Sequence, residues 1–210
     1  MMLRSAFSPD GLSAIYSDHV NLAEWRRDVP LPVRQYASEL TQQLPGYTLR
    51  QSLPASVDEY MLLDQLPILD KTSDGNRQTF ARDLVQLCDM YACLFDLELI
   101  GLRLSVLNKA MCPRFHVDHV VCRLICTYVG DGTEWLPEDS VNRHALGRMA
   151  DVDTSLQHHN ETKIQKLMEG SVALLKGEKW PGNEGRGLVH RSPVVSSGQS
   201  RLVVTLDPVA

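Results

Sequence analysis

A short segment near the middle of the chain carries residue types that bind metal ions. His116 and Asp118 are two positions apart, and on a β-strand this spacing puts both side chains on the same face. A second histidine, His190, ends an apolar run much later in the chain. Two imidazoles and one carboxylate occupy one face of an octahedral ion and leave three positions open, as is typical of non-haem Fe(II) sites. His116, Asp118 and His190 are therefore the candidate metal ligands.

An arginine stands where a cosubstrate of this metal would need one. Arg201 opens the last apolar run of the chain, and the planar fork of a guanidinium group pairs with a carboxylate through two hydrogen bonds. A divalent ion with one carboxylate ligand keeps residual positive charge, so an anionic 2-oxo acid can bind it together with O₂. Arg201 would then hold the far carboxylate of a dicarboxylic cosubstrate.

Three other arginines lie close in sequence to the candidate ligands. They are Arg114, Arg123 and Arg191. If at least two of them face the site, the substrate is anionic; the alternative is that they are solvated surface residues, which is the commoner fate of arginine.

The elements that must position these residues divide the chain near residue 96. Residues 1–96 have helical periodicity, and residues 97–210 have the alternation of strands. Helices are predicted to start near residues 8–10 and to cover 31–43, 57–65 and 77–95. Strands are predicted over 97–107, 120–129, 172–175, 187–190 and 201–206. The pattern indicates an α+β protein, or a helix-buttressed β-barrel or sandwich. We expect one compact domain, with 1–96 as a helical support region and 97–210 as the catalytic core.

A polar segment separates the second and third predicted strands. Residues 138–168 lack clear periodicity and are predicted to form a long loop with a short helix near 161–168. Because long loops without structure of their own are often functional, this segment is a candidate lid.

Composition excludes several classes of function. The chain has 210 residues and a formal net charge of −5, which disfavours binding to nucleic acid or to an anionic membrane surface. No apolar run is long enough to span a bilayer, and the N-terminus lacks the apolar region of a secretory signal. The number of cysteines is odd, five, which does not suggest the disulfide framework of a secreted protein. We expect a cytoplasmic location.

The order of these motifs resembles a known superfamily. The series His116-x-Asp118, His190 and Arg201 resembles the Fe(II)/2-oxoglutarate-dependent dioxygenases with a double-stranded β-helix (jelly-roll, cupin-like) core. Locally, the run from Arg123 to Tyr128 and the turn over 132–137 look like the prolyl-hydroxylase-type subgroup. Gly130-Asp131-Gly132 departs from the paired glycines of that subgroup, which leaves the substrate class open. The whole chain also resembles an uncharacterised bacterial family of unknown function, through residues 21–25, 115–118, 132–137, 175–177 and 190–193.

The resemblance implies a role for each matching residue. His116, Asp118 and His190 would bind Fe(II), and Arg201 would pair with the C5 carboxylate of 2-oxoglutarate. Tyr128 is a candidate hydrogen-bond donor to the same carboxylate, with Thr205 as a second possibility on the strand of Arg201. Trp135 is either a platform for the substrate or a core residue. The implied activity is an oxygenase that consumes O₂ and hydroxylates a small molecule or a protein side chain.

Two other functions are compatible with the same ligand set. Two histidines and a carboxylate also suit Zn²⁺, so a jelly-roll protein that binds zinc for metal homeostasis is the main alternative. A cupin-like isomerase or hydrolase is the third. Arg201 favours the oxygenase, because a protein that only binds metal has no need for a carboxylate clamp beside the ion. The oligomeric state is left open.

Overall fold

The computed structural model describes residues 2–70, 73–146 and 163–209. The helices are the 3₁₀ helix η1 (Pro9–Tyr16), α1 (Leu31–Gln43), α2 (Glu59–Leu63), α3 (Asp74–Phe95) and two single 3₁₀ turns, η2 (Glu138–Ser140) and η3 (Arg143–Ala145). The strands are β1 (Met2–Ala6), β2 (Val20–Trp25), β3 (Thr48–Pro54), β4 (Leu99–Leu107), β5 (Cys122–Val129), β6 (Glu134–Trp135), β7 (Gln165–Lys166), β8 (Val172–Lys176), β9 (His190–Arg191) and β10 (Arg201–Pro208). The chain is thus of the predicted α+β class.

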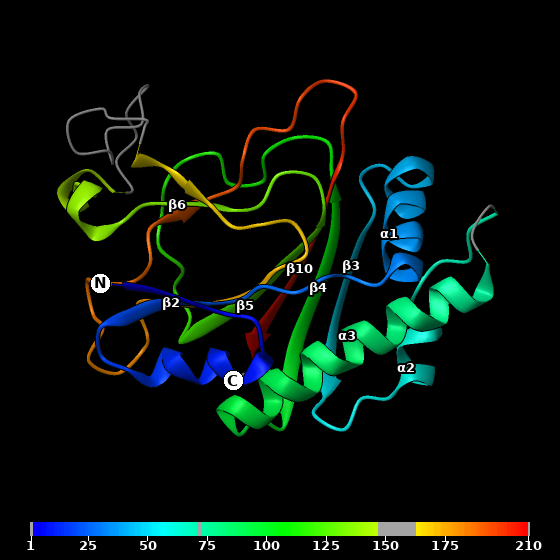
Figure 1. Cartoon of the computed structure of the whole chain (residues 1–210), viewed down its shortest axis with the longest axis horizontal. Coiled ribbons are helices and arrows are strands. Elements are labelled where there is room, and N and C mark those ends of the chain that lie inside the picture. The colour runs from blue at the N-terminus through cyan, green and yellow to red at the C-terminus, as the bar shows by residue number, and fades with distance from the viewer. Residues whose placement is uncertain (1, 71–72, 147–162, 210) are drawn as a thin grey trace.

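The strands form a large sheet and a small one. The large sheet has seven strands in the order β1-β2-β8-β5-β10-β4-β3, and the small sheet has three in the order β7-β6-β9. Neighbours in both sheets are antiparallel except β1 and β2, which are parallel. Figure 1 shows the long strands β3, β4 and β10 between the helices α1 and α3 on one side and β6 on the other.

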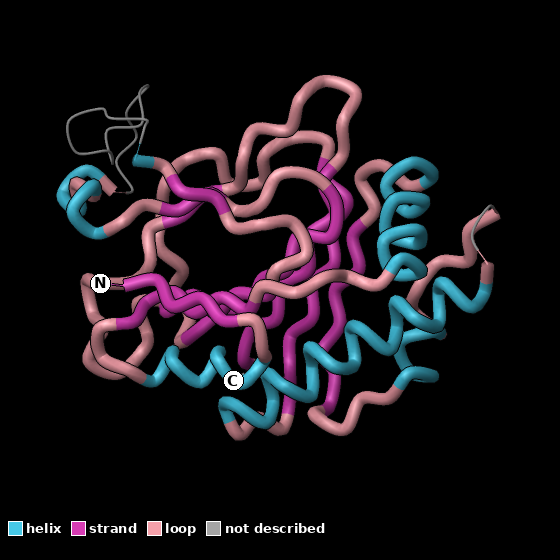
Figure 2. The backbone as a smooth tube through the Cα atoms, in the orientation of Figure 1, coloured by secondary structure: helices cyan, strands magenta, loops and turns pink. Residues whose placement is uncertain are grey.

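The first 96 residues do more than support the sheet. The expectation of a purely helical region there is corrected, because β1, β2 and β3 all come from it and occupy both edges of the large sheet. In Figure 2 these strands run beside those of the later residues as parts of one sheet. β2 is buried at every position, so it shows no alternation from which a strand could be recognised.

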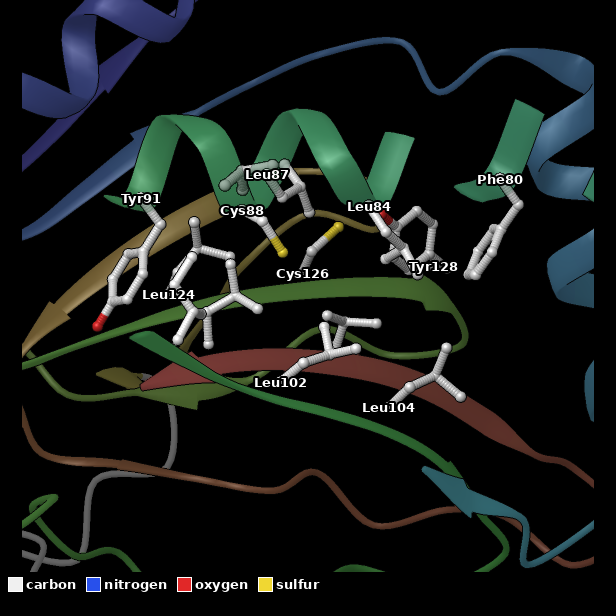
Figure 3. Close-up of a cluster of buried hydrophobic side chains, with 14 of the residues drawn as sticks. Phe80, Leu84, Leu87, Cys88, Tyr91, Leu102, Leu104, Leu124, Cys126 and Tyr128 are labelled. Atoms are coloured by element: carbon white, nitrogen blue, oxygen red, sulfur yellow. The ribbon is translucent and has the colours of Figure 1, made fainter. Parts of the chain in front are cut away.

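The long helix α3 covers one face of the large sheet, as predicted. Its first turn is capped by the Ser73 side chain, which accepts a hydrogen bond from the Asn76 amide at 3.2 Å, and it ends at Asp96, which has a left-handed φ of 50°. Its buried face packs on β4 and β5, as Figure 3 shows for Phe80 and Tyr91 of the helix. The helix thus seals one face of the sheet and leaves the opposite face for the site.

Alternation along β10 divides its side chains between these two faces. Leu202, Val204 and Leu206 pack in the core beneath the helices. The alternate residues Arg201, Val203 and Thr205 face a cavity on the other side of the sheet. Apolar residues from the large and small sheets, including Ile125 and Trp135, fill the space between the two sheets.

The predicted loop over 138–168 is only partly described. Residues 147–162 lie outside the described residues, and so does most of the candidate lid. Of the short helix expected near 161–168, Lys163 has 3₁₀ conformation, whereas residues 164–168 are not helical and Gln165–Lys166 forms β7. Among the described residues, no helix is both long enough and apolar enough to cross a membrane.

Candidate metal and cosubstrate site

The two candidate histidines are joined through their main chains. The His116 amide donates to the His190 carbonyl at 3.0 Å, and the His190 amide donates to the His116 carbonyl at 2.9 Å. The neighbouring side chains Phe115 and Val189 are 2% and 1% exposed and pack in one apolar cluster with Leu136. This bridge brings together two ligands that are far apart in the sequence, with ring centroids 4.6 Å apart.

Both imidazoles are oriented by backbone carbonyl groups. Nδ1 of His116 lies 2.9 Å from the Arg114 carbonyl oxygen, and Nδ1 of His190 lies 3.1 Å from the Leu188 carbonyl oxygen. Because a carbonyl oxygen only accepts, each Nδ1 carries the proton and each Nε2 keeps a free lone pair. Metal-binding histidines are held in this way. Burial and the nearby His190 lower the pKa of His116, which favours the neutral ring that a metal requires.

Asp118 completes the set of three ligands. Its Oδ1 lies 3.8 Å from Nε2 of His116, and its Oδ2 lies 3.3 Å from Nε2 of His190. One ligand atom from each of the three residues falls within 4.8 Å of the others. Burial raises the pKa of Asp118, but its contacts with His190, Arg123 and His116 outweigh this and lower it to about 2, so the carboxylate is ionised.

The donor atoms fit a divalent metal ion. Oδ2 of Asp118 is buried and has no hydrogen-bond donor among the described residues, although a buried carboxylate oxygen without a partner is costly. The unprotonated Nε2 atoms of His116 and His190 face the same point and cannot donate to it. A cation between these three atoms would satisfy all of them.

Arg123 positions the aspartate and does not face the cavity as a free cation. Its guanidinium group donates to Oδ1 of Asp118 at 2.7 Å and to both carboxylate oxygens of Asp207 at 2.8 and 2.7 Å. Arg123 lines the cavity, but two carboxylates already share its charge, so its contact with substrate stays a prediction. Sequence alone did not reveal Asp207 as its partner.

Arg201 is buried in the wall of the same cavity. It is 3% exposed, and its side chain donates to the Asp131 carbonyl at 2.8 Å and to the hydroxyls of Thr127 and Thr133 at 2.9 Å each. Among the described residues it has no carboxylate within ion-pair distance. Burial lowers the pKa of Arg201 to about 10, against the opposing effect of Asp131, so the group is charged at neutral pH.

One cavity joins Arg201 to the metal ligands. It is lined by both histidines, by Arg201, and by the apolar side chains of Ile125 and Val203.

The family of the chain follows from its sequence as a whole. Residues 6–207 match the family model described as a protein of unknown function, DUF1826. The chain belongs to the DUF1826 family. No curated protein matches it. The predicted resemblance to an uncharacterised family is therefore confirmed.

Solved structures similar to this DUF1826 chain include dioxygenases. The rice dioxygenase for auxin oxidation has a TM-score of 0.53 at 12% identity, and the match covers 99% of this chain and 82% of the rice chain. The complex of Arabidopsis thaliana AtDAO1 with 2-oxoglutarate has a TM-score of 0.52 at 9% identity, and the match covers 99% of this chain and 92% of the AtDAO1 chain. JOX2 in complex with 2OG, Fe and JA has a TM-score of 0.54 at 10% identity, over 99% and 75%. The predicted resemblance to the Fe(II)/2-oxoglutarate dioxygenases is confirmed, and at these identities it concerns the fold.

The DUF1826 chain places Tyr128 away from the cavity, which corrects its predicted role. Its hydroxyl donates to Oδ2 of Asp83 on α3, and its ring packs on Phe80 with centroids 5.1 Å apart. Its neighbour Thr127 contacts Arg201 instead. The signal was present in the sequence, because Thr127 is an even number of positions from Arg123 along one strand and Tyr128 is not.

The remaining predicted residues fall in different places. Thr205 and Arg191 line the cavity, whereas Arg114 and Trp135 do not. Nε of Arg191 donates to Oε2 of Glu134 at 2.7 Å, and its guanidinium group lies 4.3 Å from the Phe115 ring centroid. Arg114 is exposed and contributes its carbonyl oxygen to His116. Trp135 is partly buried and packs against the apolar cluster between the two sheets, which agrees with the second of its two predicted roles, that of a core residue.

Proposed function

We propose that this DUF1826 protein is a non-haem Fe(II)- and 2-oxoglutarate-dependent oxygenase. In this proposal the large and small sheets are the two sheets of a double-stranded β-helix. His116, Asp118 and His190 hold the metal, and Arg201 binds the C5 carboxylate of 2-oxoglutarate. When bound, Fe(II) supplies the redox chemistry in which O₂ and 2-oxoglutarate are consumed, succinate and CO₂ are released, and a C–H bond of the substrate is oxidised.

The observation that carries the proposal is that Arg201 is buried and has no carboxylate partner among the described residues. A buried cation without a counter-ion is unfavourable, and this one is held only by a carbonyl and by hydroxyl groups. Its donors are arranged around the cavity that contains the two histidines. A dicarboxylate that reaches both the metal and Arg201 would supply the missing negative charge. A zinc-binding protein would have no use for such a cation.

The chain's own residues contribute binding and orientation. The hydroxyls of Thr127 and Thr133 fix the plane of the Arg201 fork, so that little conformational entropy is lost when a carboxylate binds. The carbonyls of Arg114 and Leu188 hold the proton of each imidazole on Nδ1. Val203 and Ile125 line the space between with apolar groups, which limits the access of water to the reacting centre. Thr205 lines the cavity further along β10 and is a second residue proposed to contact the cosubstrate.

The test is spectroscopic and chemical. Fe(II) and 2-oxoglutarate are added anaerobically to the purified full chain, and the visible charge-transfer band of the chelate is recorded. We expect a band in the wild type, no band in His116→Ala, and a band that needs much more 2-oxoglutarate in Arg201→Lys, which keeps the charge and loses the fork. In air, 2-oxoglutarate should be converted to succinate.

Two outcomes would overturn the proposal. Tight zinc binding without the anaerobic band would identify a metal-binding protein. An activity unaffected by removing 2-oxoglutarate would identify a cupin-like isomerase or hydrolase. Circular dichroism of each variant shows whether it has folded, and Arg34→Gln on the exposed face of α1 is the matched arginine control.

A further inference from the structure

Two arginines face each other across the edge of the large sheet. Arg50 on β3 and Arg103 on β4 are direct partners in the antiparallel register. Like charges in this position destabilise a sheet. Neither arginine has a carboxylate within ion-pair distance among the described residues, and Nε of Arg103 is buried there without a hydrogen-bond partner. Burial and the charges of Arg50 and Arg123 lower the pKa of Arg103.

The acidic side chain nearest this pair on the same face is already occupied. Asp207 follows Arg201, Val203 and Thr205 on the cavity face of β10. Both of its carboxylate oxygens accept hydrogen bonds from Arg123. Positive charge therefore remains at Arg103 and Arg50 after the ion pairs of this face have formed.

Arg103 lies between the cavity of the candidate metal site and the protein surface. It lines the cavity that contains His116 and His190, and it also lines a shallower depression formed with Arg50 at the edge of the sheet. The register pairs Arg103 with Thr205 and pairs Arg201 with Leu107. The two arginines are thus four residues apart along the strands, about 13 Å, so they mark opposite ends of the cavity floor.

We propose that Arg103, with Arg50 beside it, binds the anionic group of the substrate, a carboxylate or phosphate on a small organic molecule. This inference rests on the proposed oxygenase function and names its substrate class. Arg201 binds the cosubstrate at one end of the cavity, and Arg103 receives the substrate anion at the other. Val203 lies between the two ends, and Ile125 is level with Arg103 because both pair with Thr205; these two side chains contact the apolar part of the substrate. The predicted anionic substrate is thus assigned to arginines other than Arg114, Arg123 and Arg191.

The test follows the Arg103 side chain directly. The ¹⁵N-labelled full chain is loaded with Zn(II) and 2-oxoglutarate, and its arginine Nε–H signals are recorded, with Arg103→Lys identifying the Arg103 signal. Phenylacetate and phenyl phosphate are the anionic probes, and phenylacetamide is the neutral counterpart. We expect the anions to shift the Arg103 signal saturably and the amide to leave it unchanged. In calorimetry, Arg103→Gln should weaken anion binding at least about tenfold, as for loss of a charged hydrogen-bond donor, while Arg34→Gln should not.

The outcomes separate this inference from the proposed function. An Arg103 signal that no anion shifts, or that phenylacetamide shifts equally, overturns the inference and leaves the 2-oxoglutarate band as the test of the oxygenase. A shift that persists in His116→Ala, which loses the metal site, supports an anion site formed by the arginines themselves. A shift that disappears in that variant overturns the assignment to Arg103 and Arg50. The ratio of the affinities for phenylacetate and phenyl phosphate shows which anion the site prefers.

Discussion

Arg123 binds one oxygen of Asp118 and leaves the other free. The 2.7 Å hydrogen bond engages Oδ1, while Oδ2 is buried without a donor. The arginine thereby fixes the rotation of the carboxylate and directs one lone pair toward the two histidines. Asp207 anchors the other side of Arg123, so the ligand, the arginine and the second aspartate form one chain of contacts.

Removing Arg123 should therefore weaken metal binding without removing a ligand. We expect Arg123→Gln to raise the Kd for Fe(II) or Zn(II) by about 10- to 100-fold, the usual effect of losing a residue that orients a ligand. Competition with a chelator measures this. Asp207→Asn should cause a smaller change in the same direction. An unchanged metal affinity in Arg123→Gln would show that Asp118 is positioned by its backbone alone.

Gly177 should be intolerant of a side chain because it lies against the segment that follows Asp118. A Cβ atom at this glycine would come within 2.1 Å of the Val120 carbonyl oxygen and 2.8 Å of the Asp118 carbonyl oxygen. The next residue, Glu178, donates its amide to the Asp118 carbonyl at 2.9 Å. We expect Gly177→Ala to lower the Tm by several degrees and to weaken metal binding, because backbone must move. Gly75→Ala in the first turn of α3 is the control for glycine replacement, because a Cβ atom there would meet only the Ser73 hydroxyl oxygen at 3.8 Å.

Tyr128→Phe separates the two interpretations of this residue. The structure places its hydroxyl on Asp83, which also receives two hydrogen bonds from Arg27 at 2.6 and 2.8 Å. We expect the variant to lose about 1–2 kcal/mol of unfolding free energy, as for a buried hydrogen bond, and to bind 2-oxoglutarate as the wild type does. Urea unfolding and titration of the anaerobic band measure the two quantities. A large loss of 2-oxoglutarate affinity in a fully folded variant would restore the role predicted from the sequence.

Glu24 should make stability depend on pH in the acid range. Its carboxylate is 2% exposed and accepts hydrogen bonds from Ser5, Arg26 and Ser171, each at 2.9 Å. Burial raises its pKa, but these donors outweigh burial and lower it below 4.5. A lowered folded-state pKa stabilises the protein above the unfolded-state pKa, and this stability is lost as pH falls through the folded-state value.

Replacing Glu24 tests the direction of this pH dependence of stability. We expect Glu24→Gln to be less stable than the wild type at pH 7 by about 1–3 kcal/mol, and the difference to shrink as pH falls below about 4. Urea midpoints at a series of pH values measure it. A difference that stays constant with pH would show that the hydrogen bonds do not depend on the charge of Glu24.

The cluster of His116, Asp118 and His190 could be predicted from the sequence because its chemistry is local. His116 and Asp118 are close in the chain, and His190 and Arg201 end or begin apolar runs, so residue type and order were sufficient. The helices α1 and α3 were predictable from their strong amphipathic periodicity. The edge strand β3 was not, since its sequence is mostly polar and its pairing with β4 joins distant segments.

The ion-pair partners of the arginines could not be predicted from the sequence. Four arginines, Arg103, Arg123, Arg191 and Arg201, line one cavity, and nothing in their local sequence says which of them receives a carboxylate. Asp207 pairs with Arg123 and Glu134 pairs with Arg191 through contacts between distant strands. The error over Tyr128 was of another kind, because strand alternation alone assigns Thr127 to the face of Arg123.

The backbone bridge between His116 and His190 sets the order in which the site assembles. In the unfolded chain only His116 and Asp118 are neighbours, and two ligands hold a metal ion weakly. Bringing His190 to them requires closure of a long loop, whose entropic cost is met when the small sheet forms. In the proposed oxygenase the ion would therefore bind after the strands have paired, and it would not act as a template for folding as it does in zinc fingers. Chelation should release the metal and leave the two sheets in place.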